Sequence, residues 1–285
     1  MSIQLLNILL LYFLTFTGIS SDPTPTAEEY VKLGRIKLEA KDYSGAIEDF
    51  SSAIALKSDY AIAYFRRASA YYLKNDYHKA LNDYTSYIQL KPEDANAYYN
   101  RAMVYKQLNN APKAIHDLSL CIYFDKEFTQ ALMKRGNLYF EATKYDSAVQ
   151  DYTQYILLKP DSEKGYYNRG NSYKRLKQFE LAMGDFNHVI ELNPKFQQAY
   201  INTGSTLADM GRYEESIIFF NKAIELDKND GEAYYNIGVA YNNMGEKDDA
   251  CTCWKKAAEL NQKDGMSMYQ SKCSKAGFTK KYSQK

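Results

Sequence analysis

The sequence predicts an all-α protein made of seven consecutive units of 34 residues, each a pair of amphipathic helices. Two observations support this: residue types recur in register, and the apolar residues inside each unit have helical spacing. The register holds from residue 27 to residue 264 without an insertion or deletion. Four columns recur: alanine or serine (Ala46, Ala80, Ala114, Ala148, Ala182, Ser216, Ala250), mostly tyrosine (Tyr30, Tyr64, Tyr98, Leu132, Tyr166, Tyr200, Tyr234), small (Gly34, Ala68, Ala102, Gly136, Gly170, Gly204, Gly238) and large (Phe50, Tyr84, Leu118, Tyr152, Phe186, Phe220, Trp254).

The fifth unit shows the helical spacing clearly. Each half of it carries one apolar stripe: Tyr166, Tyr167, Gly170 and Tyr173, then Phe179, Ala182, Met183, Phe186 and Ile190. Short polar breaks such as residues 74–76 and 210–212 separate the two helices of a unit. Pro92, Pro160 and Pro194 end the second helix before the next unit begins.

These columns resemble the tetratricopeptide repeat (TPR), whose pattern is W/Y-x₂-L-G-x₂-Y…A-x₃-F…A…P over 34 residues. The resemblance implies an α-solenoid: a right-handed superhelix of antiparallel helix pairs whose first helices line a concave groove. The closing proline is absent from four units, where Ser58, Lys126, Lys228 and Gln262 replace it. The predicted repeats one to seven are 27–60, 61–94, 95–128, 129–162, 163–196, 197–230 and 231–264.

The two ends of the chain differ from the repeats. Residues 3–19 are almost entirely apolar, which predicts a cleaved signal peptide at 1–21, followed by a linker at 22–26. An uncleaved membrane anchor and a misassigned start codon are the alternatives. Residues 265–285 are expected to form a capping helix and a basic, solvated tail, and membrane contact by that tail is the less favoured interpretation. One face of the capping helix is expected to hold Met266, Met268, Tyr269 and Cys273.

Arginine and aspartate recur together, 16 residues apart. The expected inter-helix ion pairs are Arg67 with Asp83, Arg101 with Asp117, Arg135 with Asp151, and Arg169 with Asp185. In repeats six and seven both partners change, to Thr203 with Phe219 and Ile237 with Cys253, whereas repeat one keeps Asp49 opposite Leu33. Joint replacement is typical of structural pairs, because a partly buried ion pair is costly to break one member at a time.

Three of the four cysteines lie near the C-terminal end. The segment from Ala250 to Ala257, followed by Cys273, resembles the ending of many exported bacterial repeat proteins. That resemblance implies a disulfide between Cys251 and Cys273 that staples the cap. The alternative is that Cys251, Cys253 and Cys273 are reduced and buried. Cys121 falls in a small, inward column and is expected in the core.

No catalytic or cofactor motif is present. The sequence has no phosphate-binding glycine loop, no H-E-x-x-H and no C-x₂-C pair, and His78, His116 and His188 fall at unrelated repeat positions. With 36 Lys+Arg against 35 Asp+Glu, the chain is not built to bind nucleic-acid phosphates. We therefore expect no enzyme activity, no metal, no cofactor and no small-molecule substrate, and membrane contact only through an uncleaved residue 3–19 segment.

Asparagines recur on the first helices. The candidate peptide-binding residues of the groove are Asn100, Asn168, Asn202 and Asn236 in one column, Asn137 and Asn171 three residues further on, and Arg66, Lys134, Tyr99, Tyr167 and Tyr235 beside them. An amide side chain donates to and accepts from a peptide backbone, so such a ladder suits an extended peptide. The alternative is that asparagine simply suits a polar surface.

The asparagine ladder is similar to that of the repeat arrays of peptide-glycosylating enzymes. It departs from the carboxylate clamp of chaperone-binding repeats, because the clamp's first lysine position holds Met133 or Tyr167. Gln198 with Asn202, or Glu232 with Asn236, replace its final basic pair.

We therefore predict an exported, non-enzymatic scaffold that binds protein or peptide partners in its groove, in the assembly of envelope or secreted complexes. The alternatives are an accessory or regulatory subunit of an enzyme on another chain, and a structural spacer.

Overall fold

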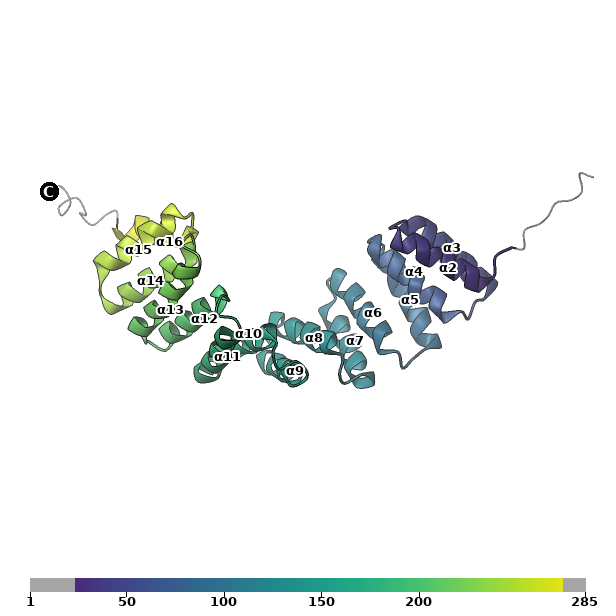
Figure 1. Ribbon diagram of the computed structural model, residues 1–285, viewed down its shortest axis with the longest axis horizontal. Helices are drawn as coiled ribbons and strands as arrows, with labels where there is room; N and C mark the ends of the chain where they lie inside the picture. The colour runs from purple at the N-terminus through teal and green to yellow at the C-terminus, as the bar shows by residue number, and fades with distance from the viewer. Residues whose placement is uncertain (1–23, 274–285) are drawn as a thin grey trace, which may run out of the picture. The chain divides into compact units, whose positions relative to one another are not determined.

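The computed structural model describes residues 24–273, which form helices and no strands (Figure 1). The expected signal peptide and the basic tail after Cys273 lie outside this range. The helices are α2 (Ala27–Glu39), α3 (Tyr43–Leu56), α4 (Ala61–Leu73), α5 (Tyr77–Leu90), α6 (Ala95–Gln107), α7 (Ala111–Phe124), α8 (Thr129–Glu141), α9 (Tyr145–Leu158), α10 (Glu163–Arg175), α11 (Phe179–Leu192), α12 (Gln197–Asp209), α13 (Tyr213–Leu226), α14 (Gly231–Met244), α15 (Lys247–Glu259), α16 (Lys263–Met268) and the π-helix η1 (Tyr269–Cys273).

The chain divides into two compact units. The first unit ends at Asn110 and contains α2 to α6, and the second begins at Ala111 and contains α7 to η1. Within each unit, the first and second helices of a repeat pack against each other, and each second helix packs against the first helix of the next repeat. The predicted all-α array of helix pairs is confirmed.

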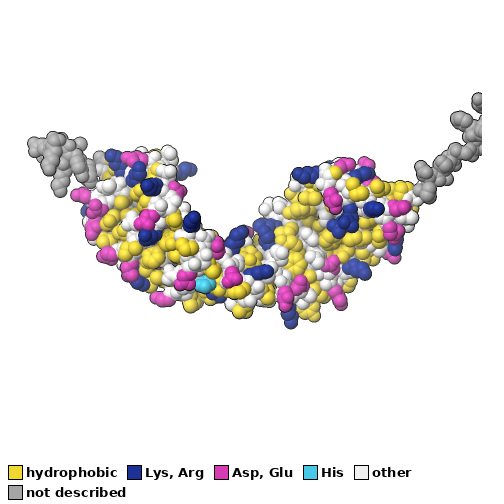
Figure 2. Space-filling model, viewed as in Figure 1, with side chains coloured by type: hydrophobic (Ala, Val, Ile, Leu, Met, Phe, Trp, Pro, Cys, Tyr) yellow, Lys and Arg dark blue, Asp and Glu magenta, His cyan; other side chains and the backbone are white. Residues whose placement is uncertain are grey.

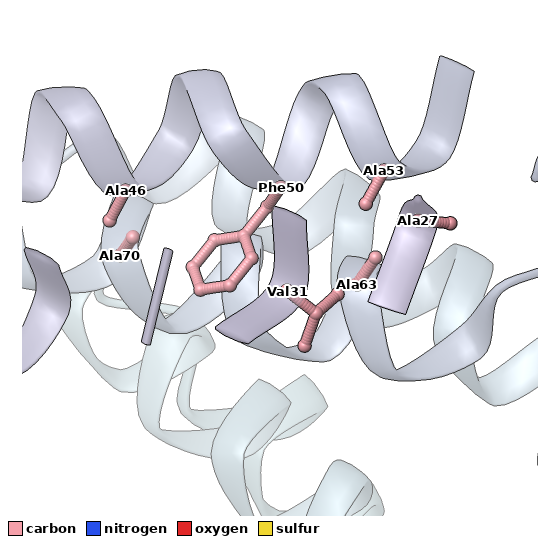
Figure 3. Close-up of a cluster of buried hydrophobic side chains, with 7 residues drawn as sticks. All are labelled: Ala27, Val31, Ala46, Phe50, Ala53, Ala63 and Ala70. Atoms are coloured by element: carbon pink, nitrogen blue, oxygen red, sulfur yellow. The ribbon is translucent and has the colours of Figure 1, made fainter. Parts of the chain in front are cut away.

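The core lies between the paired helices and repeats the same contact. The small residue of the first helix faces the large residue of the second: a Cβ on Gly136 would lie 2.7 Å from Cε1 of Tyr152. Figure 3 shows the equivalent core of repeat one, where Phe50 lies among small side chains and Val31. This close approach explains the two columns, because side chains in a close-packed core leave no room for both to be large.

The turn inside each repeat uses one left-handed residue. This position has a positive φ in every repeat: Lys41, Asn75, Asn109, Thr143, Lys177, Gly211 and Gly245. Only Gly211 and Gly245 adopt that conformation without the steric cost that a Cβ brings. The turn therefore tolerates varied residues, since packing of the two helices on either side holds it in place.

Three of the four predicted ion pairs are present, and each is bidentate. Arg67 donates to Asp83 through Nε (2.7 Å) and Nη2 (2.8 Å). Arg135 with Asp151 and Arg169 with Asp185 repeat this geometry at 2.6–2.9 Å. All three carboxylates are buried. The predicted pair of Arg101 and Asp117 has one member in each unit and stays a prediction.

All four arginines, Arg101 included, have a further partner that the arginine and aspartate columns do not reveal. The Nη1 atom of each donates to a hydroxyl on the second helix of the preceding repeat, 16 residues earlier: Ser51, Thr85, Ser119 or Thr153. The side chain therefore bridges two repeats as well as two helices. In repeat one, which has Leu33 at the arginine position, Lys37 four residues later pairs with Asp49 at 2.7 Å.

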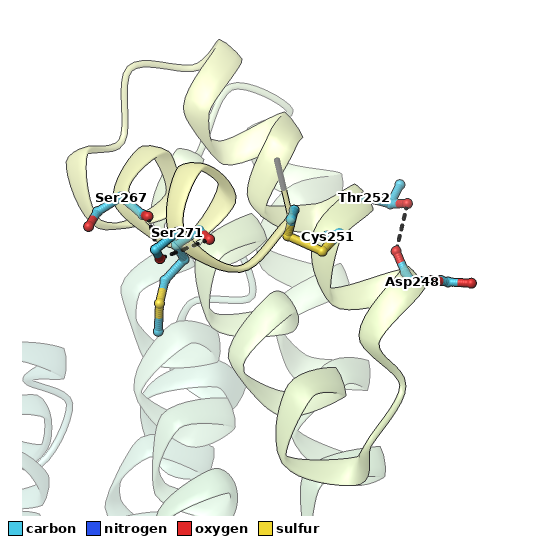
Figure 4. The surroundings of a disulfide bond; sticks show 7 residues. Asp248, Cys251, Thr252, Ser267 and Ser271 are labelled. Atoms are coloured by element: carbon cyan, nitrogen blue, oxygen red, sulfur yellow. Dashed lines mark hydrogen bonds between the residues drawn. A yellow bond between two sulfur atoms is a disulfide. The ribbon is translucent and has the colours of Figure 1, made fainter. Parts of the chain in front are cut away.

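A disulfide closes the C-terminal end. Cys251 on α15 is bonded to Cys273 on η1, with the Cα atoms 5.7 Å apart (Figure 4), so the pairing implied by the resemblance is confirmed. Near it Thr252 donates to the Asp248 carbonyl at 3.0 Å, and Ser271 to that of Ser267 at 2.8 Å. Cys121 is buried as predicted.

The cap differs from the prediction in its contact face. It begins at Lys263, and Met266 is 40% exposed, whereas Met268 and Tyr269 pack against the cluster that contains Trp254. The prediction for Met266 was wrong because Gly265, not Met266, faces Ala257, and the following turn is a π-helix with more residues per turn.

Candidate functional site

Two hollows lie on the second unit, and the first helices of repeats four to six supply most of their walls. The larger has a volume of about 660 Å³ and the smaller about 260 Å³, and Phe140 and Asn171 line both. The larger is also lined by Lys174, Arg175, Lys177, Phe179, Asn202, Ser205 and Asp209, and the smaller by Asn137, Glu141, Tyr152 and Asn168. We call the surface that contains these two hollows the inner face of α8, α10 and α12.

The asparagines of this face are bonded to one another across repeats. Asn202 Nδ2 donates to Asn171 Oδ1 at 2.7 Å, and Asn168 Nδ2 donates to Asn137 Oδ1 at 3.4 Å and to Met133 Sδ at 3.3 Å. Each pair joins the first helices of two neighbouring repeats, 31 positions apart. We call each hydrogen-bonded pair a rung of the asparagine ladder. Each rung leaves one amide N–H₂ and one carbonyl oxygen without a partner in residues 24–273.

The Tyr152 side chain supports the rung formed by Asn137 and Asn168. Its hydroxyl donates to Asn137 Oδ1 at 2.7 Å, and its ring lies buried against Gly136. Burial raises the pKa of Tyr152 far above its usual value, so the hydroxyl stays protonated and able to donate. Because Oδ1 of Asn137 is occupied, the Asn137 side chain can offer only its N–H₂ group to a ligand.

Charged side chains gather at the α10 side of the larger hollow. Lys174 Nζ lies 2.5 Å from Ser205 Oγ and 3.4 Å from Asp209 Oδ2, so protein groups already hold this ammonium. Arg175 and Lys177 are exposed and have no ion-pair partner within the described range. Elsewhere charges of both signs are interspersed, as Figure 2 shows for one side of the molecule.

The aromatic residues of the face differ from those expected. Tyr167 packs between Phe186 (ring centroids 6.1 Å apart) and Phe196 (5.2 Å), and Tyr235 packs against the disulfide cluster. Phe140 and Phe179 line the hollow instead. Phe140 and Lys174 occupy one repeat position, three residues after Asn137 and Asn171. A comparison of this position across the repeats would have identified both as residues of the same face.

The remaining candidates lie apart from the hollows. Asn236 and Lys134 are half-buried in the second unit. Arg66, Tyr99 and Asn100 are in the first unit, where Asn100 Nδ2 donates to the Asn96 carbonyl of its own helix and Arg66 Nε is buried without a partner. The structure thus brings together Asn137, Asn168, Asn171 and Asn202.

Two absences apply to residues 24–273. They contain no group of three histidine, cysteine or acidic residues placed to hold a metal ion. None of their helices combines the length and the apolar character that crossing a bilayer requires.

Paired helices that repeat every 34 residues, with first helices that line polar hollows, define a helical-repeat protein. Sequence models described as TPR repeat match residues 34–75 and 204–245, and models described as tetratricopeptide repeat match 61–94, 95–128, 130–162, 163–196 and 231–264. The chain belongs to the tetratricopeptide repeat family. Families of this fold are generally non-catalytic interaction scaffolds that bind proteins or peptides, which supports the same general role here.

Solved structures share the fold at low identity. The C-terminal part of a TPR repeat-containing protein from Cytophaga hutchinsonii has a TM-score of 0.70 at 20% identity, covering 83% of this chain and 98% of that one. A tetratricopeptide repeat protein from Parabacteroides merdae has a TM-score of 0.59 at 20% identity, covering 86% and 97%. YrrB, described as a TPR protein with an unusual peptide-binding site, has a TM-score of 0.55 at 24% identity, covering 66% and 96%. No curated protein sequence matches the chain significantly.

Proposed function

We propose that the protein is a non-enzymatic scaffold that binds an extended peptide segment on the inner face of α8, α10 and α12. The observation that carries the proposal is the rung formed by Asn171 and Asn202 at the wall of the larger hollow. Its unpaired N–H₂ and C=O groups match the C=O and N–H groups that an extended peptide presents. The unusual peptide-binding site of YrrB, which shares this fold, supports a peptide as the ligand.

The rungs favour backbone recognition because they are held in place before the ligand arrives. A side chain that is already fixed loses little rotamer entropy on binding. A net contribution of about 1 kcal/mol per hydrogen bond, offset by ordering of the peptide, predicts micromolar affinity.

The proposal includes export to an oxidising compartment, where the partner belongs to an envelope or secreted complex. The disulfide between Cys251 and Cys273 supports export, since disulfides persist mainly in such compartments. The full chain, expressed in a bacterial host, is expected in the periplasm with a mass that lacks residues 1–21. Full-length protein in the membrane fraction would instead identify an anchor, and full-length protein in the cytosol would overturn export.

The test of peptide binding uses a synthetic library of acetylated, C-terminally amidated octapeptides, incubated with the purified protein and identified by mass spectrometry after capture. The best captured peptide is then labelled and titrated by fluorescence anisotropy. We expect the N168A/N202A variant to bind it at least ten-fold more weakly than wild type.

The matched control is N187A/N221A, which makes the same change at two exposed asparagines on the second helices α11 and α13. Its affinity is expected to equal that of wild type. Capture of no peptide, or equal losses in the two double variants, would overturn the proposal. Circular dichroism at the assay temperature verifies that both variants are folded.

A further inference from the structure

We propose that the α10 side of the larger hollow binds a carboxylate of the peptide, and that Arg175 and Lys177 are the groups that recognise it. This inference rests on the proposed peptide-binding function and adds the chemical class of the ligand. It assigns a role to residues that lie outside the asparagine rungs.

The first argument is charge. The larger hollow is lined by three cations, Lys174, Arg175 and Lys177, and by one anion, Asp209. Asp209 lies 3.4 Å from Lys174 Nζ, so these two side chains largely cancel each other. Arg175 and Lys177 are left as an uncompensated pair of positive charges in the described part of the chain. A wall of this kind attracts an anion and disfavours a cation.

The second argument is that all three cations of the larger hollow lie on α10 and the turn after it. Beyond α12 the character reverses: Asp230 accepts a hydrogen bond from Gln197 at 2.7 Å, and Glu232 lies at the start of α14. Burial raises the pKa of Glu232, the nearby Asp230 raises it further, and Lys174 opposes both. Within the larger hollow, an acidic group is therefore favoured next to Arg175 and Lys177.

The third argument is the distance along the peptide. Arg175 follows Asn171 by four residues on α10, so the two side chains are neighbours about 5–6 Å apart at Cβ. An extended peptide rises about 3.3 Å per residue and places every second side chain on the same side. A peptide held by the Asn171–Asn202 rung and running along α10 towards Arg175 would thus present the side chain two residues away to Arg175.

The fourth argument is the wall around the cations. Phe140 and Phe179 line the same hollow and supply its apolar surface. Their rings offer an apolar contact next to the exposed charges of Arg175 and Lys177. The methylene groups of a glutamate side chain would also contact the two rings.

The test fixes one residue at a time in the octapeptide library, so that each pool has a defined amino acid at a defined position. Pools with Glu or Asp at a single position are expected to be captured several-fold more than pools with Gln or Asn there. In the selected peptide, replacement of that Glu by Gln is expected to weaken binding roughly three- to ten-fold, as exposed or half-exposed charge pairs do.

Two variants examine the protein side. R175Q/K177Q is expected to lose the preference for Glu over Gln. The control K159Q/K195Q removes the same charge from two exposed lysines that line neither hollow and should keep the preference. Raising the salt concentration should reduce the preference in wild type and leave R175Q/K177Q unaffected.

A carboxylate has two sources, a side chain and the C-terminus of the peptide. The library is therefore made in amidated and free-acid forms: enrichment of acidic residues in the amidated form identifies a side chain, and capture only of the free-acid form identifies the terminus. Either result supports the inference. Capture of peptides with no acidic preference in either form overturns it and leaves the proposed function standing, whereas capture of no peptide removes both.

Discussion

Repeats four and five of the second unit hold their helices together differently from repeats six and seven. In repeats four and five, Arg135 and Arg169 pair with the buried Asp151 and Asp185. In repeat six the arginine position is Thr203, fully buried and hydrogen-bonded to the Ala199 carbonyl. Repeat seven has the buried Ile237 there, and a disulfide closes the end of the array.

The comparison of these repeats shows that the 34-residue helix pair can pack without the ion pair. The two solutions fill the same space between two helices, one with a bidentate pair and one with apolar or hydroxyl side chains. A buried pair contributes little beyond its own desolvation, but one orphaned charge is costly. Both partners therefore change together, as they do in repeats six and seven.

The largest expected effect comes from breaking one pair. Arg135→Met leaves the carboxylate of Asp151, which is 3% exposed, buried without its partner and is expected to lower the free energy of unfolding by about 3–5 kcal/mol. Transfer of the repeat-six residues, in R135T/D151F, is expected to recover most of that loss. Urea unfolding followed by circular dichroism measures both.

The control for this prediction is Lys222→Met, which breaks the exposed pair of Lys222 and Glu225. Its effect is expected to stay below about 1 kcal/mol. If the double variant R135T/D151F is as unstable as Arg135→Met, the two repeat types are not interchangeable solutions.

The next effect concerns the disulfide of the repeat-seven end. Reduction is expected to lower the free energy of unfolding by about 2–4 kcal/mol, because the bond constrains the unfolded chain. Thermal unfolding with and without reductant measures this, and the C251S/C273S variant, which has no bond to lose, should not respond to reductant. An intact mass that is unchanged by reductant would show that the bond is absent.

A smaller effect comes from two glycines in the contrasted regions. Gly238→Ala places a Cβ 2.6 Å from the ring of Trp254 and is expected to cost about 1–3 kcal/mol. Gly184→Ala in repeat five meets nothing within 4 Å and is expected to stabilise its helix by up to about 1 kcal/mol. If urea unfolding shows a lower free energy of unfolding for Gly238→Ala and a higher one for Gly184→Ala, the close-packing explanation is supported. Changes of the same sign in the two variants contradict it.

The smallest effect separates the rungs from the rest of the asparagine column. Asn202→Ala removes the hydrogen bond to Asn171 and is expected to lower the free energy of unfolding by about 1 kcal/mol. Asn236→Ala removes no hydrogen bond within residues 24–273 and should change it by less than about 0.5 kcal/mol. Equal free energies of unfolding for the two variants would show that the rung does not stabilise the fold.

Features that repeat every 34 residues could be predicted from the sequence, because seven copies make a pattern visible. The helix pairs follow from the Gly136 and Tyr152 columns, and the ion pairs follow from joint changes such as Thr203 with Phe219. The hydroxyl partners of the arginines could also have been predicted. The column that begins with Ser51 changes to Asn187 and Asn221 in the two repeats that are followed by a repeat without the arginine.

The details of the candidate site were harder to predict because they depend on distances between repeats. Asn171 and Asn202 were expected to face a ligand freely, but the spacing of α10 and α12 makes them partners of each other. Tyr167 was expected at the groove, yet the same spacing places it between Phe186 and Phe196. No periodicity in one chain reveals the angle between neighbouring repeats.

The bridging arginines have a consequence for how the second unit unfolds. Arg135 and Arg169 each tie a repeat to the one before it through Ser119 and Thr153, whereas repeats six and seven have no arginine to make this tie. In an array where each repeat contacts only its neighbours, cooperativity is carried by such nearest-neighbour couplings. We therefore expect α11 and α12 to mark a boundary between two blocks that exchange amide hydrogens at different rates. The asparagine rung of Asn171 and Asn202 is a coupling across that boundary, so occupation of the hollow would slow exchange in the C-terminal block.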